Sequence, residues 1–257
     1  MERRGIGLGA GLRTERRAAP ALVLLLTACA TPPVATPSAP AASSASSAPA
    51  AAGGDASAAA RSTTAAGAVL ASRPEIVVDL RGAVDSVKKY WSARFAAQGR
   101  TFEPVRRVYA YVPGDGTGCA GEPNTPNNAA YCRPDDDIGF DVRWTAQVYD
   151  GLGDAFVYYL VGHEYAHAIQ ARLGTQLAHT IEYELQADCY AGAYLGDQIR
   201  AGVLTLENGD IEELRAGLRA VADPAGTPWF DPSAHGTAEQ RISYFGRGFD
   251  RSLSACP

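Results

Sequence analysis

The sequence predicts an α+β domain that is mostly helical, with a small β-sheet beside one buried central helix. Two observations support this fold class. Apolar residues recur at helical spacing over most of the second half of the chain, whereas only two short stretches have the composition of strands. In addition, residues 151–169 are apolar nearly all round, which is typical of a helix in the middle of a domain.

The first predicted element is an amphipathic helix over residues 75–98. Pro74 suits the first turn of a helix, and Gly99 suits the position just after its end. Between them the apolar residues follow an i, i+3, i+7 spacing: Val77, Leu80, Val84, Val87, Trp91 and Phe95. This spacing predicts a helix with one face on the core.

Two strands are predicted next. Residues 102–112 are rich in valine and tyrosine, and residues 138–142 form a second, shorter strand pattern. The segment between them, 113–134, is rich in glycine, proline and asparagine and is therefore predicted to be a long loop. We expect the strand at 138–142 to be an edge strand that can pair with an extended peptide.

Four further helices are predicted after the strands. The central one covers residues 152–172 and ends at Gly174. The next covers residues 177–200. The last two predicted helices cover residues 211–222 and 237–248. Each is expected to begin at a capping pair, Asp210 with Glu213 for the first and Thr237 with Gln240 for the second.

The N-terminal residues 1–28 have the pattern of an export signal. Five arginines precede an apolar run, residues 18–28, that is too short to span a bilayer. The run ends in Leu26-Thr27-Ala28-Cys29, which resembles the lipobox of bacterial lipoproteins. The resemblance implies that Cys29 is lipidated and anchors an exported protein to the cell envelope; the alternative is an ordinary signal peptide with an incidental cysteine.

Residues 29–72 consist almost entirely of alanine, proline, serine, threonine and glycine, so they are expected to form a disordered tether. The remainder, residues 73–257, is long enough for one domain with its own core. Removing residues 1–28 takes away five Arg and two Glu, which changes 23 basic and 28 acidic residues to 18 and 26, a net charge of about −8. This acidic balance argues against nucleic acid as a partner.

The motif that carries chemistry is His163-Glu164-Tyr165-Ala166-His167. Residues four apart lie on the same face of a helix, so His163 and His167 can bind one zinc ion. Glu164 then lies beside the metal, where it can take a proton from zinc-bound water as a general base. A chance occurrence is the alternative, and the buried helix around the motif argues against it.

A catalytic zinc site needs a third protein ligand, and Glu184 is the candidate, 17 residues after His167. Asp188 lies four residues further, on the same helical face, where it can orient a ligating histidine. The alternative is that Glu182, Glu184 and Asp188 form a solvated helix face.

Together these motifs resemble the bacterial family of "putative neutral zinc metallopeptidases". The similarity includes His163–His167, Glu-Leu-Gln-Ala-Asp-Cys-Tyr-Ala-Gly at 184–192, Tyr-Cys-Arg-Pro at 131–134, and His-Gly-Thr-Ala-Glu-Gln-Arg at 235–241. The order of the two zinc motifs also resembles gluzincin peptidases. This implies a gluzincin-like domain with one Zn²⁺ per chain, bound by His163, His167 and Glu184, with Asp188 in support.

Besides Cys29 the chain has four cysteines, an even number that suits an oxidising compartment. Three pairings are possible. We favour Cys119 with Cys132, which closes the long loop, and Cys189 with Cys256, which attaches the C-terminal segment to the helix at 177–200. Zinc binding by these cysteines is the alternative, but their spacing contains no C-x-x-C.

Two late residues, His235 and Arg241, are predicted to fold back over the zinc site and to stabilise the charge that grows on the substrate carbonyl oxygen. Their spacing resembles the late motif of membrane zinc peptidases related to the prenyl-protein enzymes. The alternative is structural: His235 precedes the last helix and Arg241 pairs with a carboxylate such as Asp188.

One acidic run, Asp135-Asp136-Asp137, is either a calcium site or, more commonly for such a run, a solvated turn.

The expected function is hydrolysis of peptide bonds in peptide or protein substrates by a zinc endopeptidase that is lipid-anchored outside the cytoplasmic membrane. The alternative from another class is an envelope lipoprotein that uses the same fold as a binding or scaffolding module without catalysis. Glu164, the expected base, is present and argues for the enzyme.

Overall fold

The computed structural model describes residues 6–7, 65–114, 116 and 118–257. Most of the expected signal segment and tether, including Cys29, lies outside these residues. Residues 65–71 are helical, and Ala66 is buried in the core. The tether was therefore predicted to extend too far, because this alanine-rich stretch favours a helix and its apolar side chains, Val69 and Leu70 among them, pack against the domain.

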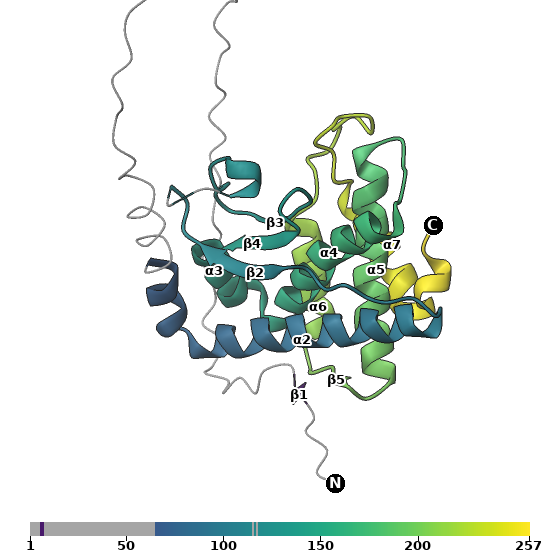
Figure 1. Cartoon of the computed structure of the whole chain (residues 1–257), viewed down its shortest axis with the longest axis horizontal. Coiled ribbons are helices and arrows are strands. Elements are labelled where there is room, and N and C mark those ends of the chain that lie inside the picture. Colours follow the sequence, from purple (N-terminus) through teal and green to yellow (C-terminus); the bar gives the residue numbers. More distant parts are fainter. Residues whose placement is uncertain (1–5, 8–64, 115, 117) are drawn as a thin grey trace, which may run out of the picture. The chain divides into compact units, whose positions relative to one another are not determined.

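The first long helix is α2, Pro74–Ala97, as the apolar spacing predicts. It runs below the sheet in the view of Figure 1, and it packs against the central helix α4. Its buried face contains Ile76, Leu80, Ala83, Val87, Tyr90, Trp91 and Phe95. The fold class, α+β and mostly α, is confirmed.

The sheet has three strands: β2, Arg107–Tyr111; β3, Ala129–Cys132; and β4, Asp137–Asp141. The order is β2-β4-β3, with β4 parallel to β2 and antiparallel to β3. The prediction that the strand at 138–142 lies at an edge is therefore wrong. β4 is the central strand and is buried along its whole length, whereas β2 and β3 are the edge strands; β3 lies inside the segment predicted to be a loop.

A helix that was not predicted, α3, Val142–Leu152, follows β4 directly. Its N-cap is Asp141, whose carboxylate accepts hydrogen bonds from the backbone N–H groups of Arg143 and Trp144. An aspartate at this position satisfies N–H groups that have no partner within the helix. Asp141 was assigned to a strand, and it serves as both the strand end and the helix cap.

The central helix α4, Asp154–Leu173, ends at Gly174, which has the left-handed conformation expected there. Every residue from Ala155 to Gln170 is buried except His167, which explains why this segment is apolar nearly all round. Within the described part of the chain, no helix is both long enough and apolar enough to cross a membrane.

The remaining elements are α5, Thr180–Arg200; α6, Asp210–Ala220; α7, Ala238–Arg251; the short strands β5, Leu204–Thr205, and β1, Ile6–Gly7, which pair in parallel; and the 3₁₀ turns η1, Cys119–Gly121, and η2, Leu253–Ala255. The predicted cap of α7 is confirmed, because Thr237 and Gln240 bond each other's backbone N–H. The predicted cap of α6 is wrong: its N-cap is Gly209, and Asp210 is already in the helix.

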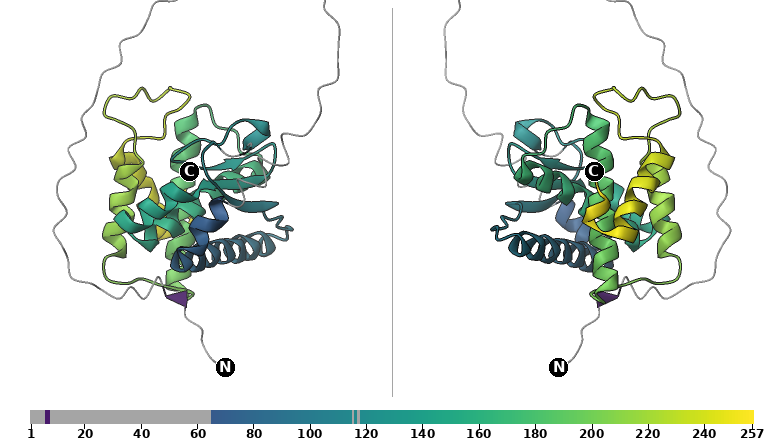
Figure 2. Two further views of the ribbon diagram at one scale, coloured as in Figure 1. Left: turned by 90° about the vertical axis from the view of Figure 1, so that its left-hand side faces the viewer. Right: turned by 90° about the vertical axis from the view of Figure 1, so that its right-hand side faces the viewer.

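Helices α5 and α7 touch backbone to backbone. A Cβ atom on Gly192 would lie 2.1 Å from the carbonyl oxygen of Phe245, and one on Gly248 would lie 1.9 Å from that of Cys189. Any side chain at these positions would force the helices apart. Figure 2 shows α7 and α6 on one side of α5 and the sheet on the other. The close contact between α5 and α7 therefore sets how near the residues of α7 lie to α5.

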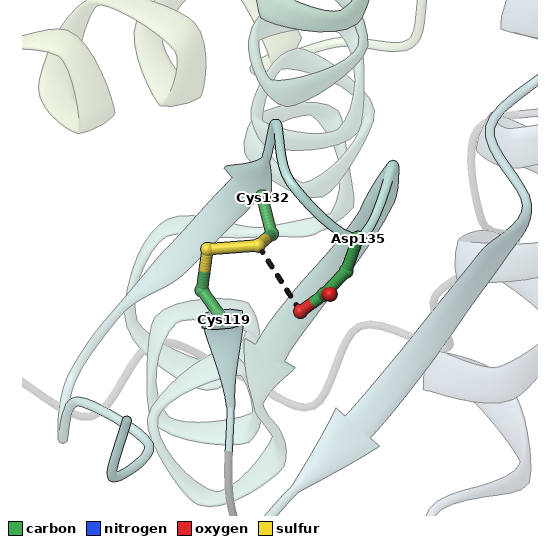
Figure 3. A group of neighbouring side chains, drawn as sticks. All are labelled: Cys119, Cys132 and Asp135. Carbon is green, nitrogen blue, oxygen red and sulfur yellow. Dashed lines mark hydrogen bonds between the residues drawn. A yellow bond between two sulfur atoms is a disulfide. The ribbon is translucent and has the colours of Figure 1, made fainter. Parts of the chain in front are cut away.

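Two disulfides are present, with the pairing we favoured. Cys119 is bonded to Cys132 and Cys189 to Cys256. Figure 3 shows the first pair, which joins η1 to the end of β3, with Asp135 beside it; the carboxylate of Asp135 lies 3.4 Å from Sγ of Cys132. Because the sulfurs are bonded to each other, the alternative of zinc binding by these cysteines does not hold.

Candidate metal centre

Helices α4 and α5 bring three side chains together. Nε2 of His163 lies 3.2 Å from Nε2 of His167 and 3.2 Å from Oε2 of Glu184. Nε2 of His167 lies 3.3 Å from Oε1 of the same glutamate. The two histidines are one turn apart on α4, and Glu184 lies in the second turn of α5, which packs directly against α4.

These spacings fit a tetrahedral zinc ion. Bonds of about 2.0–2.1 Å at tetrahedral angles separate neighbouring ligand atoms by about 3.3–3.4 Å. Two imidazole nitrogens and one carboxylate also form a ligand set typical of catalytic zinc sites, which leave the fourth position open. Residues His163, His167 and Glu184 are therefore suited to bind zinc both in chemistry and in geometry.

The charges around His163 favour a cation. Burial lowers the pKa of its imidazole, but the carboxylates of Asp188 and Glu184 outweigh burial and raise that pKa to about 10. Burial also opposes ionisation of Glu184, yet hydrogen bonds from His163 and His167 hold the pKa of Glu184 below its ordinary value. Two ionised carboxylates beside two imidazoles form a point that attracts a positive ion, either a proton or a metal.

Asp188 is fully buried and lies at the centre of a hydrogen-bond network. Arg241, from α7, donates to both of its carboxylate oxygens, at 2.9 and 3.0 Å, and the hydroxyl of Tyr159 donates to Oδ1 at 2.5 Å. The guanidinium of Arg241 also donates to the Tyr159 hydroxyl oxygen. Although burial raises the pKa of Asp188, Arg241 and His163 together hold it below its ordinary value, so this carboxylate stays ionised.

The same carboxylate faces a histidine of the metal group. Nδ1 of His163 lies 3.0 Å from Oδ1 of Asp188, although its N–H is not directed along this line and the nitrogen has no aligned hydrogen bond within the described residues. A carboxylate behind a ligating histidine selects the tautomer that leaves Nε2 free for metal. The distance suits that role, which the sequence assigned to Asp188.

Gln170 supports the other histidine. Its Oε1 lies 2.9 Å from Nδ1 of His167, and its Nε2 donates to the backbone carbonyl of Tyr183 at 2.8 Å and to Oε1 of Gln186 at 3.1 Å. The sequence analysis did not name Gln170 or Tyr159. Helical spacing is the signal that could have found them, because Gln170 lies three residues after His167 and Tyr159 four before His163.

Glu164 is buried beside the metal group and is fixed by the sheet. Its Oε2 accepts a hydrogen bond of 2.8 Å from the backbone N–H of Tyr131 in β3. Burial raises the pKa of Glu164, while His163 and His167 oppose this rise. A carboxylate with a raised pKa binds a proton more readily than an exposed one, which suits a general base.

A cleft of about 670 Å³ opens over these side chains. Its floor includes His163, Glu164, His167 and Glu184, and its walls include residues of β3 and of the segment that precedes α7. Such a volume is in the range of sites that bind small ligands or several residues of a peptide.

The two late residues both line this cleft, but they differ in their surroundings. The imidazole of His235 is half exposed, and its Nδ1 lies 3.4 Å from Oδ1 of Asp223. Arg241 is buried and bonded to Asp188, Tyr159 and the carbonyl of Val221. The structural alternative for Arg241, a pair with Asp188, is therefore the arrangement found, and we assign Arg241 to positioning.

The acidic run before β4 does not converge on one point. Asp135 accepts from the N–H of Ala120, Asp136 pairs with Arg172, and Asp137 pairs with Arg107. The three carboxylates have separate partners, so they do not form a shared calcium site.

Comparison with known proteins gives one family. The family described as "Putative neutral zinc metallopeptidase" matches residues 46–256. YpfJ of Escherichia coli is 32% identical to this chain over 184 residues, which cover 62% of this chain and 63% of YpfJ. Rv2575 of Mycobacterium tuberculosis is 31% identical over 162 residues, which cover 52% of this chain and 55% of Rv2575. The chain thus spans less than two thirds of the relatives' length, and both are described as uncharacterized. No solved structure matched.

Proposed function

Because this chain belongs to the family described as "Putative neutral zinc metallopeptidase", we propose that it is a zinc-dependent endopeptidase that hydrolyses peptide bonds, with Glu164 as the general base. One observation carries the proposal: His163, His167 and Glu184 converge at the spacing of a tetrahedral zinc ion, with Glu164 beside them at the bottom of a cleft. Zinc, when bound, supplies a Lewis acid that acidifies water and polarises a carbonyl group.

The chain's own contribution is to hold the proton acceptor in place. The N–H of Tyr131 binds one oxygen of Glu164, which leaves the other oxygen to take a proton from the attacking water. Burial keeps competing water away from the carboxylate and strengthens its interactions. The same carboxyl group can then return the proton to the leaving amine.

The edge strand β3 offers a way to align a substrate. The N–H of Tyr131 points away from β4, toward Glu164, and backbone groups alternate in direction along a strand. The N–H and C=O of Ala129, two residues earlier, therefore also point away from β4, along a cleft wall that Ala129 lines. An extended peptide can pair with this edge. β3 therefore takes the place of the strand at 138–142 as the strand expected to pair with a substrate. We propose peptides or unfolded proteins as substrates and, given the acidic balance, no nucleic acid.

Removal of the metal tests the proposal. The full chain is expected to contain about one zinc per molecule, to cleave an unfolded protein, and to lose this activity when a chelator removes the zinc, because no other group in the cleft replaces a Lewis acid. Adding zinc back should restore cleavage. Metal analysis and a fluorogenic casein assay measure both. Cleavage that survives complete loss of zinc would exclude the proposed mechanism.

His235 is proposed to stabilise the negative charge on the substrate carbonyl oxygen. Since its side chain is half exposed, His235→Ala should preserve zinc content and melting temperature and lower kcat by about 10²- to 10³-fold with little change in KM. His179→Ala is the control. Of the four histidines, His179 is the one that neither belongs to the metal group nor lines the cleft. A loss confined to KM would assign His235 to binding instead.

We also propose that the chain is exported and held at the cell envelope by a lipid on Cys29. Cys29→Ala is expected to abolish incorporation of labelled fatty acid and to release the protein from the membrane fraction, because a short apolar run without a lipid does not anchor a mature protein. Labelling and fractionation of cells that express the full chain measure this. Continued labelling in the variant would refute the assignment.

A further inference from the structure

A second group of acidic side chains lies at the opposite end of α4 from Gly174. Asp154 is the first residue of α4, and Asp210 and Glu213 lie in the first turn of α6. One carboxylate oxygen from each of them lies within 4.8 Å of the other two. We call Asp154, Asp210 and Glu213 the acidic cluster.

The backbone is shaped to admit this cluster. A Cβ atom on Gly153 would lie 2.0 Å from Oε2 of Glu213, so the carboxylate occupies the space that a side chain at position 153 would fill. Gly153 also has a φ of 104°, which other residues rarely adopt. The glutamate therefore lies directly against the first turn of α4, and its Oε2 is 3.4 Å from the N–H of Ala155.

Among the residues that the structure describes, no basic side chain balances these charges. None of the three carboxylates makes an ion pair there with a lysine, arginine or histidine. Burial is the main reason that the pKa of Asp154 is raised to about 6 and that of Glu213 to about 7, and the nearby carboxylates of Asp210 and Glu207 add to both shifts. Carboxylates brought together without a counter-charge repel one another, so the acidic cluster favours the binding of either protons or a cation.

Two buried polar atoms without hydrogen-bond partners among the described residues belong to residues one turn apart on α4. Oδ2 of Asp154 and the hydroxyl of Tyr158 are both buried, and neither has a hydrogen-bond partner within the described part of the chain. Tyr158 is completely buried and lies one turn after Asp154 on the same helical face. After burial, the negative charges of Asp79 and then of Asp154 raise the pKa of this hydroxyl, so it lies within the electrostatic influence of one member of the acidic cluster. Buried polar groups in native proteins rarely lack partners, so something polar or charged is expected between them.

We propose that the acidic cluster binds a calcium ion that joins the first turn of α4 to the first turn of α6. The ligands are all carboxylate oxygens, which calcium prefers, and neither histidine nor cysteine is present to favour zinc. An ion with bonds of about 2.3–2.6 Å spans about 4.6–5.2 Å between opposite ligands, which accommodates the oxygen spacing. Water completes the coordination, because Asp154 and Glu213 are only partly buried. A bound water also gives the Tyr158 hydroxyl a partner.

The ion would act on stability, separately from the peptidase reaction. Asp154 lies nine residues before His163, or about 13–14 Å along the helix, too far to touch the zinc ligands. Helix α6 ends beside Val221, whose carbonyl accepts from Arg241. A calcium ion between α6 and α4 would therefore hold the end of α6, where Ala220 lines the cleft, relative to the helix that carries His163 and His167.

Calorimetric titration and thermal unfolding of the zinc-loaded full chain test this proposal, and neither measurement depends on catalysis. The wild type should bind one Ca²⁺, and calcium at about 100 times its Kd should raise the melting temperature by about 5–10 °C. The double variant Asp154→Asn/Glu213→Gln should show neither effect. Glu212→Gln is the matched control, because it removes the same charge from an exposed position in the same turn of α6, and it should behave as the wild type.

A third measurement guards against a variant that merely folds badly. In calcium-free buffer the double variant should melt at or above the wild-type temperature, because it lacks the repulsion between carboxylates. The proposal would be overturned if calcium gave the wild type neither a heat of binding nor a rise in melting temperature. It would also be overturned if the double variant responded to calcium as the wild type does. The three carboxyl groups would then share protons instead of a calcium ion.

Discussion

A Glu164→Gln variant is expected to retain its zinc and to cleave an unfolded protein about 10²- to 10⁴-fold more slowly than the wild type. Glutamine keeps the size of the side chain and can still accept the hydrogen bond from the N–H of Tyr131, but its amide cannot take a proton from water. Metal analysis, melting temperature and kcat, measured on the same preparation, separate loss of the base from loss of the site.

Glu239→Gln is a suitable control, since it makes the same change at an exposed position on α7. His163→Ala or Glu184→Ala should instead lose the metal, because each removes one of the three converging ligands. If Glu164→Gln turns over substrate at the wild-type rate, Glu164 is not the base. A wild type with zinc but without any cleavage would favour the binding module over the enzyme.

Replacement of Arg241 by alanine is expected to lower the free energy of unfolding by about 3–5 kcal/mol, because it leaves the carboxylate of Asp188 buried without its counter-charge. For a domain of this size the melting temperature should fall by about 10 °C. Zinc affinity should fall as well, since Asp188 faces the Nδ1 atom of His163. Thermal unfolding and competition with a chelator measure the two effects.

A second variant distinguishes positioning from catalysis. Asp188→Asn/Arg241→Met removes both charges together, so it should recover part of the lost stability while zinc affinity stays about 10- to 100-fold below that of the wild type. If Arg241→Ala instead left stability and zinc affinity unchanged and lowered only kcat, Arg241 would be an oxyanion donor, as the sequence first suggested. The structure favours the positioning role because the guanidinium is buried and bonded to three partners.

The motif residues were accessible from the sequence because their geometry is local or nearly so. His163 and His167 are one turn apart, and any helix with that spacing directs both side chains to one side. The helix itself was predictable, since a long apolar stretch closed by Gly174 has few other structures available. Glu184 and Asp188 needed one further step, the packing of α5 against α4, and the resemblance to a known family supplied it.

The errors arose where pairing partners are distant in sequence. β3 was assigned to a loop because glycine, proline and asparagine precede it and only four residues form the strand. β4 was taken for an edge because a strand's own residues do not reveal how many neighbours it has. The cap of α6 was wrong for a similar reason: Glu213, expected to close a capping box, lies against Gly153 of another helix.

The mostly helical fold class, the bounds of the long helices within a few residues, and the residues suited to bind zinc could all be predicted from the sequence, because helical periodicity and motif spacing are properties of neighbouring residues. The folded chain was needed to show which strand borders the cleft, that Tyr131 holds Glu164, and that Tyr159 and Arg241 are bonded to Asp188. These contacts join residues from different elements, in one case 53 positions apart. They depend on how closely the helices pack. Glycines such as Gly192 and Gly248 allow this close packing, and no pattern of neighbouring residues predicts it.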